Sequence, residues 1–382
     1  MESRPTWAEV SLPALRHNYR VVRDLVAPAT ICAVLKADAY GHGAVECAEA
    51  LEAEGATWFG VTSTGEGVEL RQAGVKARIL LMTGFWQGEE EDVLRYQLTP
   101  AVWEPIHLEL LDCAARRLGP TGKPVPVHLK VDTGMTRLGI AWEGSEGIVE
   151  LLKSLPRLTL EGVATHLASS EVMDAADVEL QSRRFDQVLE ALANRGCSPK
   201  FVHMANSAAL ALRPASWKTM VRPGLCLYGY FLKFRNTEGK ATDAPPPFSP
   251  EPVLSWKTRI LTLRDVLAGQ AVGYGGTYVT PGPSRIAVLP VGYADGLNRQ
   301  LSNRGRVVVR GQYARIVGNI SMDITLIDVT PIPGATVGDE VVLLGRNGGL
   351  AVSPHEHAAI AATVPYEILC AISKRVPRRY LK

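Results

Sequence analysis

The sequence predicts an α/β fold: an N-terminal (β/α)8 barrel followed by a mainly β C-terminal domain. Eight strand-like runs, most of them separated by amphipathic helical stretches, occupy about 230 residues. This number of strands and this length are typical of such a barrel. A proline-rich stretch then separates them from a second region in which strand-like runs follow one another directly. The total length of 382 residues allows about two domains.

The composition excludes several classes of protein. Hydrophobic residues make up 46% and charged residues 21% of the chain, as in a soluble globular protein. A net charge of +2 gives no reason to expect nucleic-acid or membrane binding. No apolar run reaches the ~18 residues of a membrane span, and the opening residues lack the apolar core of a secretory signal. We therefore expect a cytoplasmic protein.

Metal and redox motifs are not found. The six cysteines are scattered and form no C-x-x-C pair, and most lie in apolar or helical contexts, as small core residues do. His355 and His357 lie two residues apart, a spacing that does not place them on one face of a helix. No metal site is therefore expected.

The first elements are a short strand over Trp7–Val10 and a helix that continues to Val26. Ser11 is placed to cap this helix and Pro13 lies in its first turn. The strand at residues 1–10 is assigned to the second domain. Two domains are thus predicted, the barrel at 11–243 and the mainly β domain at 244–382.

The eight predicted barrel strands are apolar runs that alternate with helical stretches such as Leu108–Leu118, Glu146–Leu155 and Val178–Asn194. The runs are Ile31–Leu35, Trp58–Thr62, Arg78–Met82, Leu98–Trp103, Val125–Val131, Leu158–Thr165, Phe201–Ala205 and Met220–Tyr228. A doubly wound open sheet is the alternative, but it would prefer fewer strands and a dinucleotide-binding G-x-G-x-x-G motif, which is not found.

Polar residues stand where these strands end, and functional residues of a (β/α)8 barrel lie at those ends. They are Lys36, Thr62, Thr83, Lys130, Asp132, His166, Asn206, Ser207 and Arg222. Lys36 ends a buried strand and precedes a turn containing Gly41 and Gly43. Partial desolvation there would lower the pKa of its amine and free it for Schiff-base chemistry; by itself, however, it could equally be an ordinary solvated lysine.

Two glycine-containing segments are further candidates. The Ser207 hydroxyl with Asn206, and the backbone around Arg222 and Gly224, could together cradle a phosphate, although ordinary βα turns would look the same. In the stretch 272–278, the glycines around Tyr274 could expose its phenol, although a hairpin turn explains them equally well.

The second domain begins after a proline-rich segment near 243–250 that can hold neither a helix nor a central strand. Its predicted strands are Val253–Leu263, Ala271–Val279, Arg285–Val291, Arg306–Val309, Ala314–Val317, Ile324–Val329 and Glu340–Leu344. A late helical patch covers Pro354–Ser373 and is interrupted by Pro365.

Eight ordered segments resemble the alanine racemase family, whose members are fold-type III enzymes dependent on pyridoxal 5′-phosphate. The segments are AVLKADAYGHGA, HLKVDTGMTRLG, EGVATHLASS, HMANSAAL, VRPGLCLYG, VGYGGTY, LPVGYADGLNR and VGNISMDITLIDV. The resemblance spans essentially the whole chain. It implies interconversion of L- and D-alanine, supply of D-alanine for peptidoglycan, and a homodimer with shared active sites.

The resemblance also implies a role for each matched residue. Lys36 would hold the cofactor covalently and act as one acid/base, and Tyr274 of the partner subunit would act as the other. Arg222 would face the pyridine nitrogen, with His166 linking it to Tyr274. The other matched residues would contact the cofactor phosphate (Tyr40, Ser207, Gly224, Leu225 and Tyr366) or the substrate (Arg137, Tyr293 and Met322, with Asp323 nearby).

Three positions bear on variation within the family. Lys130 matches a lysine that is carbamylated in some members. Gly276 and Ser321 stand where other members carry a basic residue and a cysteine, and both differences could alter substrate preference. The alternatives are a racemase of broader specificity, acting for example on serine, and a non-catalytic cofactor-binding barrel.

Overall fold

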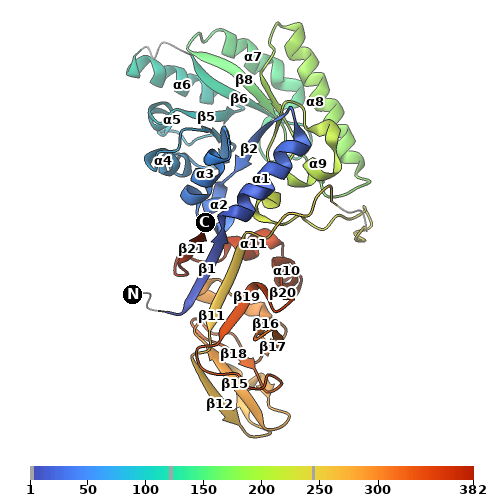
Figure 1. Cartoon of the computed structure of the whole chain (residues 1–382). Coiled ribbons are helices and arrows are strands. Elements are labelled where there is room, and N and C mark those ends of the chain that lie inside the picture. Colours follow the sequence, from blue (N-terminus) through green and yellow to red (C-terminus); the bar gives the residue numbers. More distant parts are fainter. Residues whose placement is uncertain (1–3, 120–123, 243–245) are drawn as a thin grey trace. The chain divides into compact units, whose positions relative to one another are not determined.

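The computed structural model describes residues 4–119, 124–242 and 246–382 and divides into two compact units, which are considered separately (Figure 1). The first, the barrel unit, comprises Leu15–Ala39 and Ala44–Glu251. The second, the β unit, comprises the N-terminal residues up to Ala14, the short segment Tyr40–Gly43, and Pro252–Lys382. The domain boundary predicted at 243/244 lies outside the described residues.

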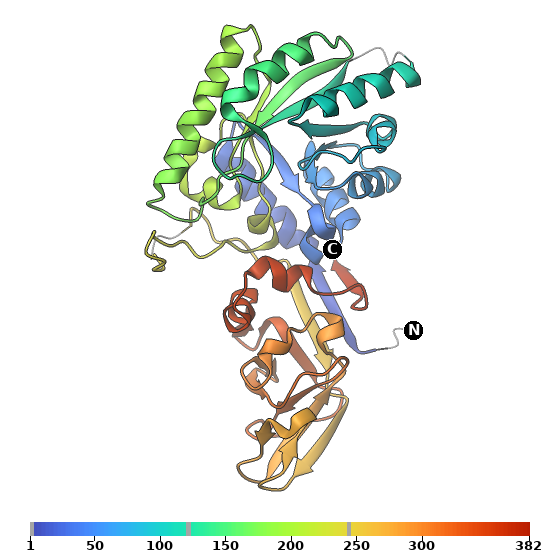
Figure 2. The same ribbon diagram turned by 180° about the vertical axis from the view of Figure 1, so that it is seen from behind.

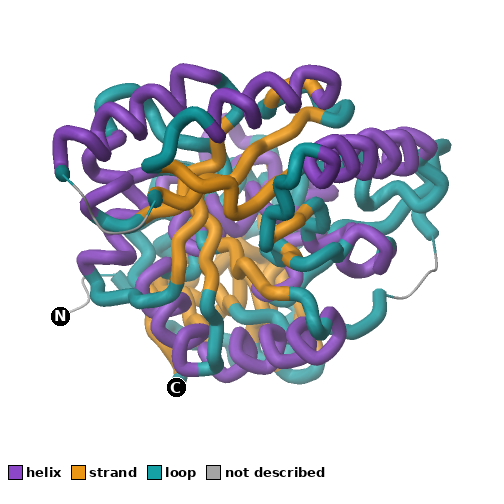
Figure 3. The backbone as a smooth tube through the Cα atoms, turned by 90° about the horizontal axis from the view of Figure 1, so that it is seen from above, coloured by secondary structure: helices purple, strands orange, loops and turns teal. Residues whose placement is uncertain are grey.

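The barrel unit is a closed ring of eight parallel strands (Figure 3), so the predicted barrel is confirmed. The order β5-β4-β3-β2-β10-β9-β8-β6 closes because β5 also pairs with β6, and this closure excludes an open doubly wound sheet. The strands are β2 (Thr30–Val34), β3 (Trp58–Val61), β4 (Arg78–Leu81), β5 (Leu98–Val102), β6 (Val125–Asp132), β8 (Leu158–Ala164), β9 (Phe201–His203) and β10 (Met220–Val221). A short strand, β7 (Ile140–Ala141), pairs with β6.

Helices alternate with these strands and begin at recognisable sequence signals. The Ser11 hydroxyl accepts from the Ala14 backbone at 3.2 Å, as predicted for a cap, and Ser63 with Glu66 forms a capping box. The helices are α1 (Leu12–Val26), α2 (Lys36–Gly41), α3 (Ala44–Ala53), α4 (Thr64–Gln72), α5 (Glu90–Arg95), α6 (Pro105–Leu118), α7 (Ser145–Lys153), α8 (Ala176–Asn194) and α9 (Ser207–Leu212).

The last barrel strand is shorter than the predicted run Met220–Tyr228. It ends at Val221 and is followed by the 3-10 helix η3 (Leu225–Tyr228). Pro223 has no N–H to donate to a neighbouring strand, so the ladder cannot continue through it. The Pro223 carbonyl instead accepts from the Val34 backbone at 2.9 Å.

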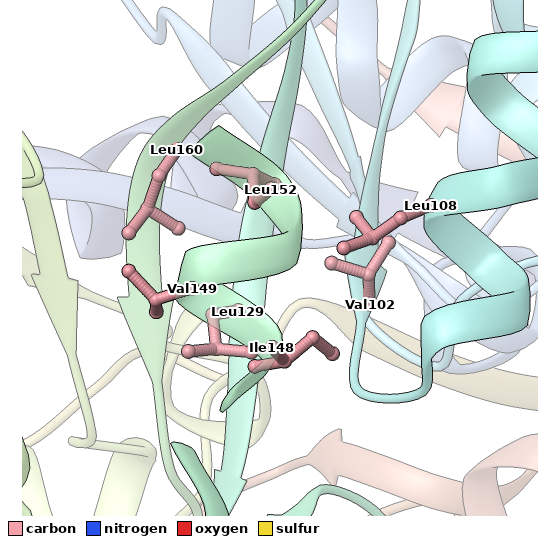
Figure 4. Close-up of a pocket in the computed structure, with 7 residues that line it drawn as sticks. All are labelled: Val102, Leu108, Leu129, Ile148, Val149, Leu152 and Leu160. Carbon is pink, nitrogen blue, oxygen red and sulfur yellow. The ribbon is translucent and has the colours of Figure 1, made fainter. Parts of the chain in front are cut away.

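Apolar side chains fill the space between the strands and the outer helices. Figure 4 shows a small pocket lined by valine, leucine and isoleucine side chains from β5, β6, β8, α6 and α7. They are Val102, Leu108, Leu129, Ile148, Val149, Leu152 and Leu160. This lining offers no polar group for a ligand, so the pocket belongs to the packing of the core.

The β unit is built on one sheet with the order β12-β15-β18-β17-β16-β19-β11-β1-β21, and β20 pairs with β19. Its strands are β1 (Thr6–Ser11), β11 (Leu254–Arg259), β12 (Thr262–Val266), β15 (Ser284–Leu289), β16 (Arg306–Val309), β17 (Gln312–Ile316), β18 (Thr325–Asp328), β19 (Glu340–Asn347), β20 (Leu350–Val352) and β21 (Arg378–Leu381). Two helices follow β20, α10 (Pro354–Ala361) and α11 (Pro365–Cys370). The first and last strands, β1 and β21, lie side by side (Figure 2).

Two predicted strands of this unit are wrong in extent. The run Val253–Leu263 is divided into β11 and β12, which pair with different strands, β19 and β15. The run Ala271–Val279 becomes a separate two-stranded ribbon, β13 (Ala271–Val272) and β14 (Tyr278–Val279). Three glycines with φ of 73°, 71° and 55° interrupt it at Gly273, Gly275 and Gly276, a backbone conformation that glycine adopts readily.

Candidate active site

Lys36 lies two residues after the end of β2 and opens a turn of left-handed backbone. Residues 37–40 have φ between 53° and 55°, although none of them is glycine. This conformation costs roughly 1–2 kcal/mol per residue for L-amino acids. The Glu66 carboxylate accepts from the Ala37 backbone at 2.7 Å, and the Asp38 carboxylate accepts from the Ala44 backbone at 2.8 Å. Strain of this kind is concentrated at functional sites, and nothing in the sequence analysis anticipated it.

Positively charged groups are gathered near Lys36 at the carboxyl ends of the strands. Burial, together with the charges of Arg222, Arg137 and Lys36, lowers the pKa of Lys130 to about 7. Burial and the same arginines hold the pKa of His166 well below its usual range. The Lys130 amine donates to the Met82 carbonyl at 3.1 Å. Such a concentration of positive charge suits an anionic ligand.

Arg222 is buried in the barrel unit, and acceptors hold both of its terminal nitrogens. Its Nη1 donates to His203 Nδ1 at 2.7 Å, and its Nη2 donates to the Thr165 carbonyl at 2.9 Å and to His166 Nδ1 at 3.2 Å. Burial lowers the pKa of Arg222 to about 10, so the guanidinium still carries its charge at neutral pH. Arg222 and His166 are therefore directly linked.

The Ser207 hydroxyl and the Gly224 backbone, proposed from sequence as parts of one anion site, are in contact. Ser207 Oγ accepts from the Gly224 backbone at 2.9 Å and from the Cys226 backbone at 3.4 Å, which leaves its hydrogen to be donated to an anion. Asn206 caps α9 by accepting from Ala209 at 3.0 Å, and its amide donates to Ser170. Leu225 follows Gly224 as the first residue of η3.

The segment Tyr40–Gly43 belongs to the β unit, where it is fixed against α11 and β21. The rings of Tyr40 and Tyr366 lie 5.7 Å apart between centroids. The Gly41 carbonyl accepts from Arg378 Nε and Nη2 at 3.1 and 2.9 Å. A Cβ atom at Gly41, which has φ of 81°, would lie 2.5 Å from the Leu369 carbonyl oxygen, so no larger residue fits there. The two tyrosines are thus brought together by this anchorage.

Tyr274, Tyr293 and Met322 form an exposed patch on the β unit, which we call the tyrosine patch. Their exposed fractions are 76%, 44% and 52%. The segment 319–322 connects them: Asn319 donates to the Tyr274 carbonyl at 2.9 Å, and the Ser321 carbonyl accepts from the Tyr293 backbone at 3.0 Å. Large exposed side chains grouped in this way are typical of interaction surfaces.

The polar residues beside this patch pair with arginines. The Asp323 carboxylate accepts from Arg375 at 2.6 Å. Its backbone carbonyl accepts from Arg4 at 3.2 Å, and Arg4 also forms an ion pair with Asp295 at 3.0 Å. In contrast, Arg137 of the barrel unit is exposed in the loop that follows β6.

Sequence reasoning missed a row of polar residues next to Arg222, formed by the buried His203 and His128 and the partly exposed Glu161. A usable signal was present. His128 and Lys130 are two residues apart in one strand, so their side chains share a face, and that face is otherwise expected to be apolar. Among the described residues, none of the helices is long and apolar enough to cross a membrane, and no group of acidic, histidine and cysteine side chains could hold a metal ion.

Comparison with known proteins identifies relatives of both units. The family model described as alanine racemase, N-terminal domain, matches residues 10–231, and that described as alanine racemase, C-terminal domain, matches residues 253–380. An alanine racemase of Geobacter sulfurreducens is 42% identical over 386 residues, covering 100% of this chain and 98% of the relative.

Solved structures agree with these matches. An alanine racemase of Clostridium difficile 630 gives a TM-score of 0.91 at 34% identity, covering 99% of this chain and 96% of that one. An alanine racemase of Bartonella henselae, solved with covalently bound pyridoxal phosphate, gives a TM-score of 0.86 at 30% identity, covering 99% of each chain.

Proposed function

The chain belongs to the alanine racemase family and is an amino-acid racemase dependent on pyridoxal 5′-phosphate, and we propose that it interconverts L-alanine and D-alanine by a two-base mechanism. Its product would be D-alanine for peptidoglycan. A racemase that also accepts serine is the second candidate, because the family resemblance implies that some members carry a basic residue and others a cysteine where this chain has Gly276 and Ser321.

The barrel unit offers groups that suit the cofactor. We propose that Lys36 holds it covalently, and that Asn206, Ser207, Gly224 and Leu225, with Tyr40 and Tyr366, hold its phosphate. The buried Ser207 hydroxyl, and the positive charge gathered around Lys130, support this assignment, because both stabilise an anion. When bound, the cofactor withdraws electrons from the substrate's α-carbon and so eases removal of the α-proton.

Arg222 is proposed to face the pyridine nitrogen. A guanidinium can donate hydrogen bonds but cannot accept them, so a nitrogen that faces it has to accept and stays unprotonated. The charge retained on Arg222, whose pKa is about 10, supports this role. An unprotonated ring withdraws electrons less completely, which would favour simple proton return over side reactions such as transamination.

Two acid/base groups on opposite faces of the substrate are needed to remove a proton from one side and return it to the other. We propose Lys36 for one face and the partner subunit's Tyr274 for the other, in a homodimer with two composite sites. The exposure of Tyr274 supports an interface role. A free tyrosine has a pKa of about 10. The His166 ring, whose Nδ1 accepts from Arg222, carries its proton on Nε2 and could donate it to the phenolate.

The remaining assignments concern the substrate and the cell. Arg137 is proposed to bind the substrate carboxylate, and Tyr293 and Met322 of the partner, with Asp323 nearby, to limit the size of its side chain. Work in the cytoplasm is supported by the six cysteines, none of which forms a disulfide among the residues that the structure describes. Lys130, with its pKa of about 7, has a partly neutral amine, as carbamylation would require.

The observation that carries the proposal is the match of both family models across the chain, with the Lys36 turn and the Arg222 cluster at one end of the barrel. Purified protein loaded with pyridoxal 5′-phosphate is expected to convert L-alanine to D-alanine, measured with D-amino-acid oxidase. Lys36→Ala should lose nearly all of this activity. Parallel assays with L-serine separate the two candidate functions, and no turnover of either substrate would contradict both.

A further inference from the structure

A row of polar side chains connects Arg222, through the buried His203 and His128, to the partly exposed carboxylate of Glu161 in the barrel unit. Arg222 Nη1 lies 2.7 Å from His203 Nδ1, and His203 Nε2 lies 2.9 Å from His128 Nδ1. His128 Nε2 is buried and lies 3.7 Å from Glu161 Oε2, which is too far for a direct hydrogen bond but leaves the carboxylate facing this nitrogen. Glu161 is itself paired with Arg78 on β4.

The proton positions along this row follow from its two ends. The arginine can only donate, so His203 Nδ1 must accept, and a neutral His203 ring therefore carries its proton on Nε2. That proton points to His128 Nδ1, which must accept in turn, so the His128 proton is on Nε2, facing the Glu161 carboxylate. Burial lowers the pKa of both histidines, which keeps the rings neutral. With both rings neutral, this arrangement satisfies both hydrogen bonds of the row and directs the remaining N–H of His128 toward Glu161.

Two backbone features allow this row to form. The pairing of β6 with β8 shifts register so that Val127 is opposite Leu160 and His128 is opposite Gly162, which leaves Glu161 without a partner as a bulge. Leu160 meanwhile lines the apolar pocket of Figure 4. A Cβ atom at Gly162 would lie 2.6 Å from the His128 ring, so only glycine leaves room for it. Bulges commonly redirect a side chain next to a functional site.

We propose that Glu161, His128 and His203 are positioning residues that fix the orientation of the Arg222 guanidinium toward the cofactor. The Glu161 carboxylate selects the His128 tautomer, His128 selects the His203 tautomer, and His203 then presents an acceptor to Arg222. With the opposite tautomer, His203 would present an N–H to a group that can only donate, and Arg222 would move. The inference rests on the proposed role of Arg222 and extends it to residues that do not touch the cofactor.

Nitrogen-15 NMR of the histidines tests the row without relying on activity. The chain has eight histidines, few enough to assign by single substitutions. In both cofactor-free and loaded protein, His203 and His128 are expected to carry their protons on Nε2, and Glu161→Gln should produce a second tautomer at both. Gly162→Ala, which removes no polar group, should shift the His128 signals by displacing its ring. The opposite tautomers in the wild type, or no change in either variant, would overturn the proposal.

Kinetics then show whether the row acts on Arg222. Glu161→Gln is expected to lower kcat by about tenfold with little change in KM, as for other residues that orient a catalytic group. The matched control is Glu54→Gln, because Glu54 is equally shielded, with 18% of its side chain exposed against 19% for Glu161, and also pairs with an arginine. This control should keep wild-type kcat. Equal loss in both variants would mean a general effect of removing a carboxylate and would contradict the proposal.

Substitutions at His128 separate positioning from packing. Glutamine can accept from His203 and donate toward Glu161, whereas leucine can do neither, so His128→Gln should retain more activity and more of the loaded protein's wild-type cofactor absorption than His128→Leu. Equal losses at unchanged thermal stability would contradict positioning. If the wild type racemises nothing, the proposed function fails, while the NMR result still decides whether the row orders the histidines.

Discussion

The two groups of candidate site residues differ in how firmly their own unit holds them. In the barrel unit, Arg222 and Ser207 are buried and hydrogen-bonded on several sides. In the β unit, the side chains of Tyr274, Tyr293 and Met322 are largely exposed, and it is their backbones that are anchored. We call the site residues of the barrel unit the barrel half of the proposed site and those of the tyrosine patch its exposed half. We infer that the barrel half is preorganised within one chain, whereas the exposed half acquires its surroundings from a partner.

The largest effect is expected when the barrel half and the exposed half are inactivated in different subunits. If the proposed homodimer forms, Lys36→Ala and Tyr274→Ala proteins should each lose activity by at least about a thousandfold, since each would lack one of the two proposed acid/base groups. Mixing them and allowing subunits to exchange should restore activity to about a quarter of the wild type, because half of the dimers are mixed and each has one intact site. Native mass spectrometry verifies the exchange. Exchange without recovered activity would place both residues in one chain's site.

A smaller loss of activity is expected when the positive charge of Arg222, in the barrel half, is reversed. Arg222→Glu should slow racemisation by about a hundredfold, the upper end for a residue that tunes a bound group. A carboxylate would let the pyridine nitrogen hold a proton, so transamination should increase and the visible spectrum of the loaded protein should change. Pyruvate formation and absorption spectra measure both effects. An unchanged spectrum and product ratio would show that Arg222 does not face the nitrogen.

The positive charges gathered in the barrel half should also make the free energy of unfolding depend on pH. The pKa of Lys130 is about 7 when folded, below its ordinary value, so between these values the unfolded chain binds more protons and stability rises with pH. Lys130→Met should therefore be more stable than the wild type at pH 7, by about 2–4 kcal/mol, and the difference should shrink toward pH 10. Urea unfolding of the cofactor-free protein at several pH values measures this.

The exposed half supplies the control for that experiment. Tyr274→Phe should change stability by less than about 0.5 kcal/mol at every pH, because the side chain is exposed and surface substitutions rarely do more. A pH-dependent effect at Tyr274 as large as that at Lys130 would erase the distinction between the halves. A flat profile for Lys130→Met minus wild type would show that the amine is not desolvated.

A smaller loss than that expected for Arg222→Glu is expected at the proposed phosphate site. Ser207→Ala should weaken binding of pyridoxal 5′-phosphate by about tenfold, the value of one hydrogen bond to a charged group. Ser216→Ala is the matched control, since this serine is equally buried but donates to the Arg213 carbonyl instead. Fluorescence titration of cofactor-free protein measures both. Equal weakening in the two variants would remove Ser207 from the phosphate site.

Much of the fold was predictable because its signals are local. The Ser11 cap, the apolar strands and the glycines around Tyr274 each determine nearby backbone through hydrogen bonding, burial or permitted φ. Closure of the barrel followed from counting strands. The errors arose where the bounds of a strand depend on its pairing partners. An apolar run such as Val253–Leu263 does not reveal that its two ends pair with different strands.

The sequence by itself determined the barrel, the mainly β second unit, the family and the list of candidate residues, because strand periodicity and ordered motifs lie along the chain. Only the tertiary structure decided that residues 37–40 adopt a left-handed turn held by Glu66, and that a bulge at Glu161 places a carboxylate behind His128. Strand register and proton-ordered contacts join residues far apart in sequence, such as Arg78 and Glu161, and their energies depend on burial. No spacing along the chain encodes that burial.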